Sequence, residues 1–179
     1  MAKVVSPQFW LHKALAEMTT VEWEALCDGC GKCCLHKLVE DVGAEELGGG
    51  PGHADAHAEN GLYMDPAERL YYTDIRCAQL DSESGQCRCY AQRLETVATC
   101  VNITLADLPR IHFMPNSCAY RRVHEGRGLP DWHPLLHDGS QAAMLAARQS
   151  VRSHPTVSEQ DIDEDDFELR IVSWPLGDN

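Results

Sequence analysis

Nine cysteines are the side chains with the most distinctive chemistry in this 179-residue chain. Four of them are crowded into eight residues: Cys27, Cys30, Cys33 and Cys34. Two successive C-x-x-C steps place three sulfurs on a short, turning backbone, where thiolates can converge on one metal ion or cluster. Gly29 and Gly31 give that loop the positive-φ freedom that such a turn requires. The pattern therefore predicts metal binding.

The spacing leaves the identity of the metal open. A structural zinc ion takes four thiolates with sulfur about 2.3 Å away, and a cubane iron–sulfur cluster also takes four. The first three cysteines match the C-x-x-C-x-x-C spacing of bacterial ferredoxins, in which Cys34 has no counterpart. Because neighbouring side chains in an extended segment diverge, Cys33 and Cys34 are expected to serve different metals or to bridge two. The remaining cysteines are Cys77, Cys87, Cys89, Cys100 and Cys118.

Disulfide bonding is the less favoured explanation for these cysteines. The first ten residues lack the apolar stretch of a signal peptide, and no apolar run is long enough for a transmembrane helix. A cytoplasmic location is therefore expected, where clustered thiols more often bind metal than form disulfides. An odd number of cysteines also fits poorly with complete pairing.

Whether the chain is an enzyme is left open by its motifs. It has no G-x-S-x-G elbow, no glycine-rich phosphate loop and no H-E-x-x-H sequence. A cysteine nucleophile would need a paired histidine, whereas clustered cysteines favour shared ligation of a metal. No catalytic residue and no organic cofactor are predicted.

Basic residues are interleaved with the cysteines and could offset the negative charge of a thiolate-bound metal. They are Lys32, Arg76, Arg88, Arg121 and Arg122. The alternative interpretation is that they are ordinary exposed cations. His36, two residues after Cys34, is either a ligand, a hydrogen-bond donor to a ligand, or a surface histidine.

The net charge of −13 is concentrated in two parts of the chain. Residues 40–68 contain eight acidic residues and residues 159–168 contain seven, whereas the cysteine-bearing remainder is close to neutral. Such runs are usually solvated, although an unknown protein partner could bind there. The chain lacks the basic footprint of a nucleic-acid binder, and no membrane partner is expected.

These features predict a single metal-binding domain over residues 1–155 and an acidic C-terminal tail over 156–179. Residues 40–68 form an acidic, glycine-rich insertion in that domain, and its run Gly48–Gly52 predicts a flexible loop. His53 and His57 lie four residues apart within it. Because glycines surround them, neither is assigned as a ligand.

The local patterns predict short elements around the cysteines. Ser6 and Pro7 would begin an amphipathic helix. Thr20 would cap a second helix that leads to residues 27–34, here called the cysteine loop. Strands are expected over 70–77 and 86–90, joined by a turn, with a possible edge strand over 169–174. Further helices are expected over 104–109, 115–124 and 140–149. The predicted fold is mostly α with a small β-hairpin, an α+β class, compact and organised around metal.

The chain resembles the bacterial CxxCxxCC family of zinc- or iron-chelating proteins, and most closely its YcgN-like branch. The resemblance spans about residues 8–152 and is carried by Trp23–Lys37, Tyr72–Cys77, Cys87–Tyr90, the segment ending in Cys100, Thr104–Pro109, Cys118–Arg121 and Asp131–Leu135. The fifteen-residue block around the first cysteines is the most specific part. The long acidic stretch near residues 40–68 departs from the usual family pattern.

The resemblance implies a set of eight shared cysteines as metal ligands: Cys27, Cys30, Cys33, Cys34, Cys77, Cys87, Cys100 and Cys118. Cys89 belongs to the narrower branch and is the less certain ligand. A flagellin lysine methylase has a similar cysteine cluster, so an iron–sulfur-dependent redox or protein-modifying enzyme is one alternative to a metal-binding protein. An interaction or adaptor protein with a structural metal is the other.

Overall fold

The computed structural model describes residues 8–41 and 68–176. His53, His57 and most of the acidic insertion lie outside these ranges. The α-helices are α1 (Phe9–His12), α2 (Thr20–Ala25), α4 (Arg93–Thr96), α5 (Ala119–His124) and α6 (Ala142–Ala146), and the strands are β1 (Leu35–Asp41), β2 (Glu68–Arg76), β3 (Val157–Ser158) and β4 (Ile171–Val172). The 3-10 helices are η1 (Leu15–Glu17), η2 (Lys32–Cys34), η3 (Tyr90–Gln92), η4 (Leu108–Phe113), η5 (Pro134–Leu136), η6 (Val151–Ser153), η7 (Glu159–Asp161) and η8 (Glu164–Arg170). Many short helices beside a small sheet confirm the predicted α+β class.

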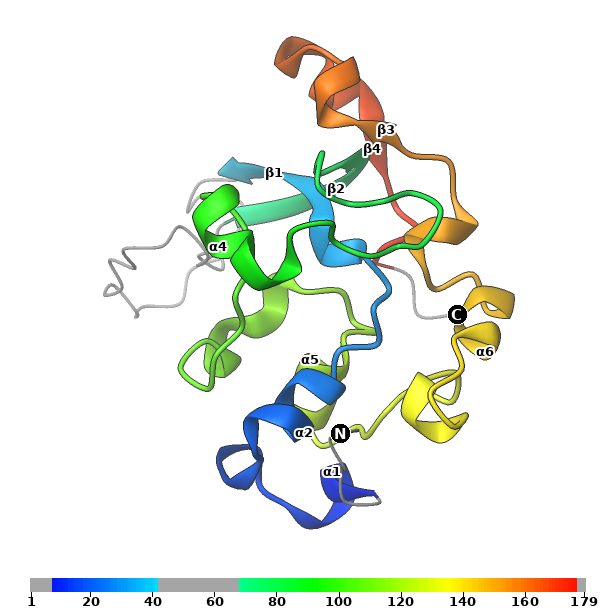
Figure 1. Ribbon diagram of the computed structural model, residues 1–179. Coiled ribbons are helices and arrows are strands. Elements are labelled where there is room, and N and C mark those ends of the chain that lie inside the picture. The colour runs from blue at the N-terminus through cyan, green and yellow to red at the C-terminus, as the bar shows by residue number, and fades with distance from the viewer. Residues whose placement is uncertain (1–7, 42–67, 177–179) are drawn as a thin grey trace.

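The sheet is built around β2. β1 and β4 each pair with β2 in antiparallel orientation, and β3 pairs with β2 in parallel orientation. The sheet lies at one end of the molecule, with α1, α2 and α5 grouped at the other end (Figure 1). The cysteine loop ends where β1 begins, because η2 leads directly into that strand. The loop therefore connects the helical end to the sheet.

The pairing of β2 differs from the hairpin that the sequence indicates. Residues 86–90 form no strand; an isolated bridge between Leu80 and Cys87 closes the turn, with the Asp81 amide donating to the Gln86 carbonyl and the Arg88 amide to the Gln79 carbonyl. The principal partner of β2 is β1, which sequence patterns did not predict. The two strands are separated in sequence by residues 42–67, so no local turn signal marks their pairing.

The helices are shorter than the sequence patterns predict. Ser6 and Pro7, where the sequence predicts a helix start, lie outside the described residues, and the first described helix runs from Phe9 only to His12. Thr19 rather than Thr20 caps α2: its hydroxyl accepts the amide of Glu22, whose carboxylate accepts the Thr19 amide. This capping box fixes the start of the helix that leads into the cysteine loop. Among the described residues, no helix combines the length and apolarity needed to cross a membrane.

Two clusters of buried apolar side chains meet at the cysteine loop. The larger cluster comprises Phe9, Leu26, Leu108, Ile111, Phe113, Met114, Cys118, Ala119, Tyr120 and Leu129. The smaller cluster, at the sheet, comprises Leu35, Tyr72, Leu80 and Val151. Cys33 packs against the larger cluster and Cys34 against the smaller one. The adjacent cysteines therefore stand at the boundary between the two cores.

The acidic C-terminal segment packs on the sheet. β3 and β4 both pair with β2, and Phe167 between them is buried. Arg170 forms a two-pronged ion pair with Asp74 of β2, with N–O distances of 2.8 and 2.7 Å. These contacts hold residues 157–172 against the cysteine-bearing body, and the domain division at residue 155 remains a sequence prediction.

Candidate metal centre

The cysteine loop is held in shape by glycine and by the segment that packs outside it. Gly29 and Gly31 have φ values of 71° and 76°, the left-handed conformation that glycine adopts without strain. A β-carbon on Gly31 would lie 2.6 Å from a methyl group of Val151. The Val151 amide also donates to the Cys30 carbonyl at 2.9 Å. The loop is therefore pressed closely against residues near the start of η6.

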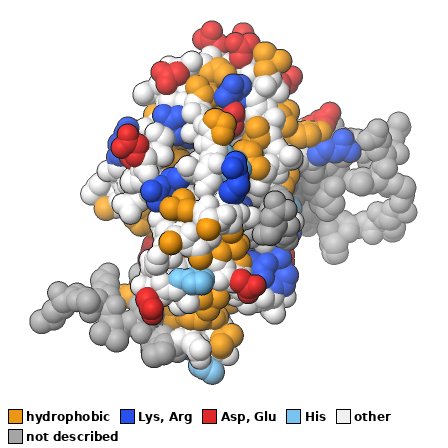
Figure 2. All heavy atoms as spheres, turned by 90° about the vertical axis from the view of Figure 1, so that its right-hand side faces the viewer, with side chains coloured by type: hydrophobic (Ala, Val, Ile, Leu, Met, Phe, Trp, Pro, Cys, Tyr) orange, Lys and Arg blue, Asp and Glu red, His pale blue; other side chains and the backbone are white. Residues whose placement is uncertain are grey.

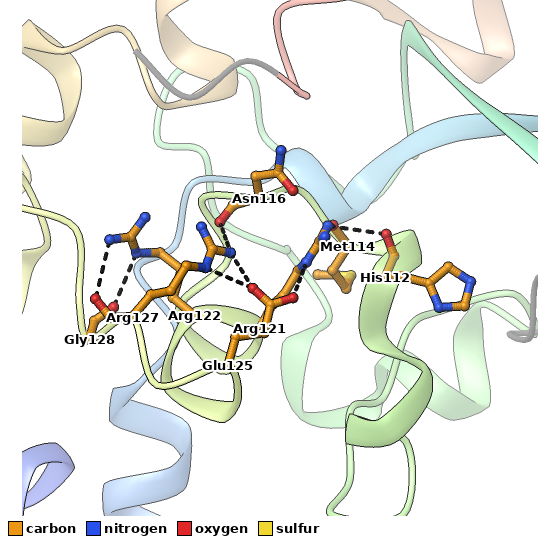
Figure 3. Close-up of polar contacts among 8 residues, drawn as sticks. All are labelled: His112, Met114, Asn116, Arg121, Arg122, Glu125, Arg127 and Gly128. Atoms are coloured by element: carbon orange, nitrogen blue, oxygen red, sulfur yellow. Dashed lines mark hydrogen bonds and ion pairs between the residues drawn. The ribbon is translucent and has the colours of Figure 1, made fainter.

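Cys118 reaches the loop from the beginning of α5, which an arginine clamp anchors. Arg121 and Arg127 both pair with Glu125, and Arg121 also donates to the carbonyls of His112 and Met114 (Figure 3). Because these bonds join α5 to the chain on either side, they fix the helix whose N-cap is Cys118.

Four thiols form the first cysteine set: Cys27, Cys30, Cys33 and Cys118. Cys33 and Cys118 belong to the same apolar cluster. Burial raises the pKa of Cys30, and the charges of Asp28 and Cys33 raise it further. Burial likewise raises the pKa of Cys118 to about 12, with the same two charged neighbours adding to the effect. These influences show that the four thiols share one electrostatic environment, with the Asp28 carboxylate among them.

Five thiols form the second cysteine set, at the end of the sheet: Cys34, Cys77, Cys87, Cys89 and Cys100. The Cys77 amide donates to the Cys34 carbonyl at 2.8 Å, which joins the end of β2 to the cysteine loop. The Leu80–Cys87 bridge brings the segment with Cys87 and Cys89 back toward Cys77. The sulfurs of Cys87 and Cys89 are 3.7 Å apart. Burial raises the pKa of Cys100 and the Arg93 charge acts to lower it, while Cys33 of the first set and then Cys87 and Cys89 of the second set add smaller increases.

The two sets touch through Cys33 and Cys34, whose sulfurs are 3.9 Å apart. A hydrogen bond between them lowers the pKa of Cys33 to about 7, and the same bond raises the pKa of Cys34. One thiol of the pair therefore ionises readily while the other keeps its proton. Two metal centres using these sulfurs would be contiguous.

The donor set fits a thiolate-bound metal in chemistry, because zinc and a cubane iron–sulfur cluster each take four thiolates. The two close sulfur pairs, Cys33–Cys34 at 3.9 Å and Cys87–Cys89 at 3.7 Å, show how closely the thiols are packed. Over residues 8–41 and 68–176, no three Cys, His, Asp or Glu side chains are arranged as a metal-coordination site. Side-chain rotation would have to complete such a site.

A half-buried lysine that the sequence patterns did not single out, Lys37, lies beside this junction. Lys37 Nζ donates to the carbonyls of Cys33 and Leu35, each at 2.9 Å, and lies 5.1 Å from the ring centre of Tyr72. Burial lowers the pKa of Lys37, while thiolates at Cys33 and Cys34 act to raise it. Its ammonium group is therefore placed where it would offset thiolate charge.

The basic residues that the sequence did single out differ in position. Lys32 is fully buried and donates to Ser117 at 3.0 Å and to Gln149 at 2.6 Å. Arg76 donates to the Thr156 carbonyl, whereas Arg88 is exposed and pairs with Asp81. Arg121 and Arg122 belong to α5 and hold backbone carbonyls. Of the predicted cations, Lys32 is the one enclosed beside the cysteine loop.

His36 faces the C-terminal segment. Its Nε2 pairs with the carboxylate of Glu159, and its ring stands edge-on to Phe167 at 5.2 Å. The second oxygen of Glu159 accepts the Ala78 amide at 2.7 Å, next to Cys77. The structure thus gives His36 a carboxylate partner that sequence spacing could not identify.

The surface carries its charges unevenly. On the face drawn in Figure 2, acidic side chains gather at the sheet end, and basic side chains are interspersed with apolar ones. This face shows no continuous basic stripe of the kind that follows a nucleic-acid backbone.

Comparison with known proteins matches a family profile to the cysteine-bearing part of the chain. The profile of the CxxCxxCC family, described as "Putative zinc- or iron-chelating domain", matches residues 26–119, a span that contains all nine cysteines. UPF0260 proteins of Shewanella pealeana and Shewanella denitrificans are 41% and 43% identical over 170 residues, covering 95% of this chain and 97% of each relative. A UPF0260 protein of an Enterobacter species is 40% identical over 167 residues, covering 93% of this chain and 95% of the relative. No solved structure matches the chain.

Proposed function

The chain belongs to the CxxCxxCC family, and we propose that it is a metal-binding protein whose ligands are clustered cysteine thiolates. The observation that carries this proposal is the meeting of thiols from distant parts of the chain between the sheet and the helices: Cys33 and Cys34 lie 3.9 Å apart, Cys118 packs in the same cluster as Cys33, and the Cys77 amide bonds to the Cys34 carbonyl. Zinc and iron, including an iron–sulfur cluster, are the metals that such a donor set accepts.

The proposed ligands fall into two groups of four. Cys27, Cys30, Cys33 and Cys118 would hold one metal centre, and Cys34, Cys77, Cys87 and Cys100 would hold the other. The division is supported by the packing of Cys33 and Cys34 against different apolar clusters. Bound metal would join the two cores and supply folding free energy there.

Binding would displace protons from these sites. Burial raises the pKa of Cys30, Cys77 and Cys118, so these thiols carry protons at neutral pH. Because a metal binds the thiolate form, loss of each proton accompanies ligation, and affinity rises as the pH rises.

Metal analysis of anaerobically purified protein tests the proposal. We expect tightly bound zinc or iron: a zinc protein would be colourless, and an iron–sulfur protein would be brown with charge-transfer absorption. Cys87→Ser should lower the metal content, and its matched control Cys89→Ser should leave it near normal, because two groups of four ligands need eight sulfurs.

Equal losses from the two variants would show that both cysteines ligate, which their 3.7 Å separation permits. Protein that retains neither metal, and takes up neither zinc nor iron when reduced, would contradict the proposed function.

A further inference from the structure

Asp28 has a buried carboxylate oxygen that accepts no hydrogen bond from the described residues. The residue is 6% exposed, and its Oδ1 accepts the amide of Cys30 at 2.9 Å. Its Oδ2 has no hydrogen-bond partner in the described part of the chain. A buried carboxylate oxygen without a donor is costly, so the position calls for a proton donor or a cation.

The free oxygen belongs to the first cysteine set. The carboxylate is fixed within the cysteine loop by the Cys30 amide, and Gln141 donates to the Asp28 carbonyl at 3.3 Å from outside the loop. Asp28 directly follows Cys27 and bonds to the Cys30 amide, so its carboxylate is enclosed beside two thiols of the first set. Thiolates and a carboxylate crowded together repel one another unless a cation lies between them.

Cys27 is the most open member of the same set. It is exposed, whereas Cys118 is buried and the other two are half-buried. Its amide still donates to the Glu24 carbonyl, at 3.3 Å, so it sits on the last turn of α2 at the rim of the loop. Asp28 therefore offers an enclosed oxygen donor beside a solvent-exposed sulfur donor.

We propose that Asp28 is a further ligand of the first centre, with Oδ2 binding a divalent metal of the zinc type alongside Cys30, Cys33 and Cys118. Cys27 is then the ligand that this centre can spare. The inference rests on the proposed function and deepens it, because it makes the first centre a mixed sulfur and oxygen site. Aspartate oxygen binds zinc at about 2.0–2.2 Å, compared with about 2.3 Å for sulfur.

The test uses the full-length reduced protein, zinc alone as the probe, and four proteins: unaltered, Asp28→Asn, Cys27→Ala and the double variant. Asparagine keeps the Oδ1 acceptor for Cys30 and removes the charge. In competition with a chromophoric chelator, we expect Asp28→Asn to weaken one zinc-binding step at least about 10-fold and Cys27→Ala to weaken it less. The double variant should lose that step, a non-additive result showing that the two donors substitute for each other.

X-ray absorption at the zinc edge gives a second, structural measurement. The unaltered protein should show an oxygen neighbour at about 2.0–2.2 Å beside its sulfur neighbours, because two centres of four cysteines each would show sulfur alone. Asp107→Asn is the matched control, because Asp107 is also buried and its carboxylate also accepts a nearby amide. It should leave both zinc-binding steps unchanged.

Three outcomes are distinguishable. Zinc affinity that Asp28→Asn does not alter, or zinc with sulfur neighbours alone in the unaltered protein, would overturn the Asp28 inference and leave the cysteine sites standing. A lower melting temperature of zinc-loaded Asp28→Asn, without weaker zinc binding, would reduce Asp28 to a structural acceptor and overturn it too. Failure of the unaltered protein to bind zinc or iron would overturn the inference together with the proposed function.

Discussion

Gly31 imposes two separate restraints on the cysteine loop. Its φ of 76° is a conformation that L-residues with side chains adopt at a cost, and its missing β-carbon leaves room for Val151. The loop also bonds to this residue through Cys30. One small residue thus sets both the turn between two cysteines and the close packing of a distant segment.

We expect Gly31→Ala to lower the free energy of unfolding by about 2–5 kcal/mol, combining about 1–2 for the left-handed backbone with about 1–3 for overpacking. Urea denaturation at one fixed metal concentration measures it. Gly126→Ala is the control, because Gly126 has a φ of 72° and open space around it, so about 1–2 kcal/mol should be lost.

Adding Val151→Ala to Gly31→Ala should recover part of the loss by removing the clash. Equal destabilisation by the two glycine variants would show that contact with Val151 contributes nothing.

The helices and strands that position the cysteines are short, so their stability depends on capping interactions at their ends. α2 has six residues, too few for an isolated helix to be stable, so its capping box and tertiary contacts must hold it. Glu22 completes that box and also forms an ion pair with Lys13, at 2.7 Å. The hydrogen bond from Lys13, followed by that from the Thr19 amide, lowers the pKa of Glu22 to about 2.

This shift predicts how stability depends on pH. The folded-state pKa of about 2 lies below the ordinary value of 4.5, so ionised Glu22 stabilises the fold above pH 4.5. That contribution is lost as the pH falls from 4.5 toward 2. Glu22→Gln should therefore lower the melting temperature at neutral pH, with the difference from the unaltered protein vanishing near pH 2.

Thermal melts across this pH range measure the effect, and Glu95→Gln on an exposed part of α4 is the control. A constant difference between the Glu22 variant and the unaltered protein at every pH would show that shape rather than charge matters.

At the scale of the whole molecule, the two apolar clusters adjoin at Cys33 and Cys34, each of which packs against one of them. The smaller cluster holds only four buried residues, which is little apolar surface for an independent core. Its links to the larger cluster include the Cys33–Cys34 step and the bond between the Cys77 amide and the Cys34 carbonyl. Metal at these cysteines would join the sheet to the helices.

Removing the metal should therefore abolish cooperative melting. A structural zinc site contributes on the order of 10 kcal/mol, comparable to the whole stability of an average domain. Calorimetry of reduced protein before and after treatment with a chelator measures the change, and restoring zinc should restore the transition. An unchanged melting temperature after complete metal removal would contradict a structural role for the metal.

The sequence alone predicted metal-binding chemistry for this protein and indicated much of its local structure. Cysteine spacing predicts metal binding, the family resemblance implies which cysteines are ligands, Gly29 and Gly31 mark the turn, and short capped segments beside β-rich residues predict the α+β class. These inferences depend on contacts between neighbouring residues, so they can be read from local patterns.

Tertiary structure decided which distant residues meet. The pairing of β1 with β2 spans residues 42–67, and the division of the cysteines follows from two separate apolar clusters. Asp28 gains its significance only from burial, and Lys37 from its contacts with the Cys33 carbonyl and the Tyr72 ring, both of which depend on how the folded segments pack. An unpartnered oxygen at Asp28 leaves no trace in sequence spacing, because hydrogen bonding is settled by what surrounds an atom in space.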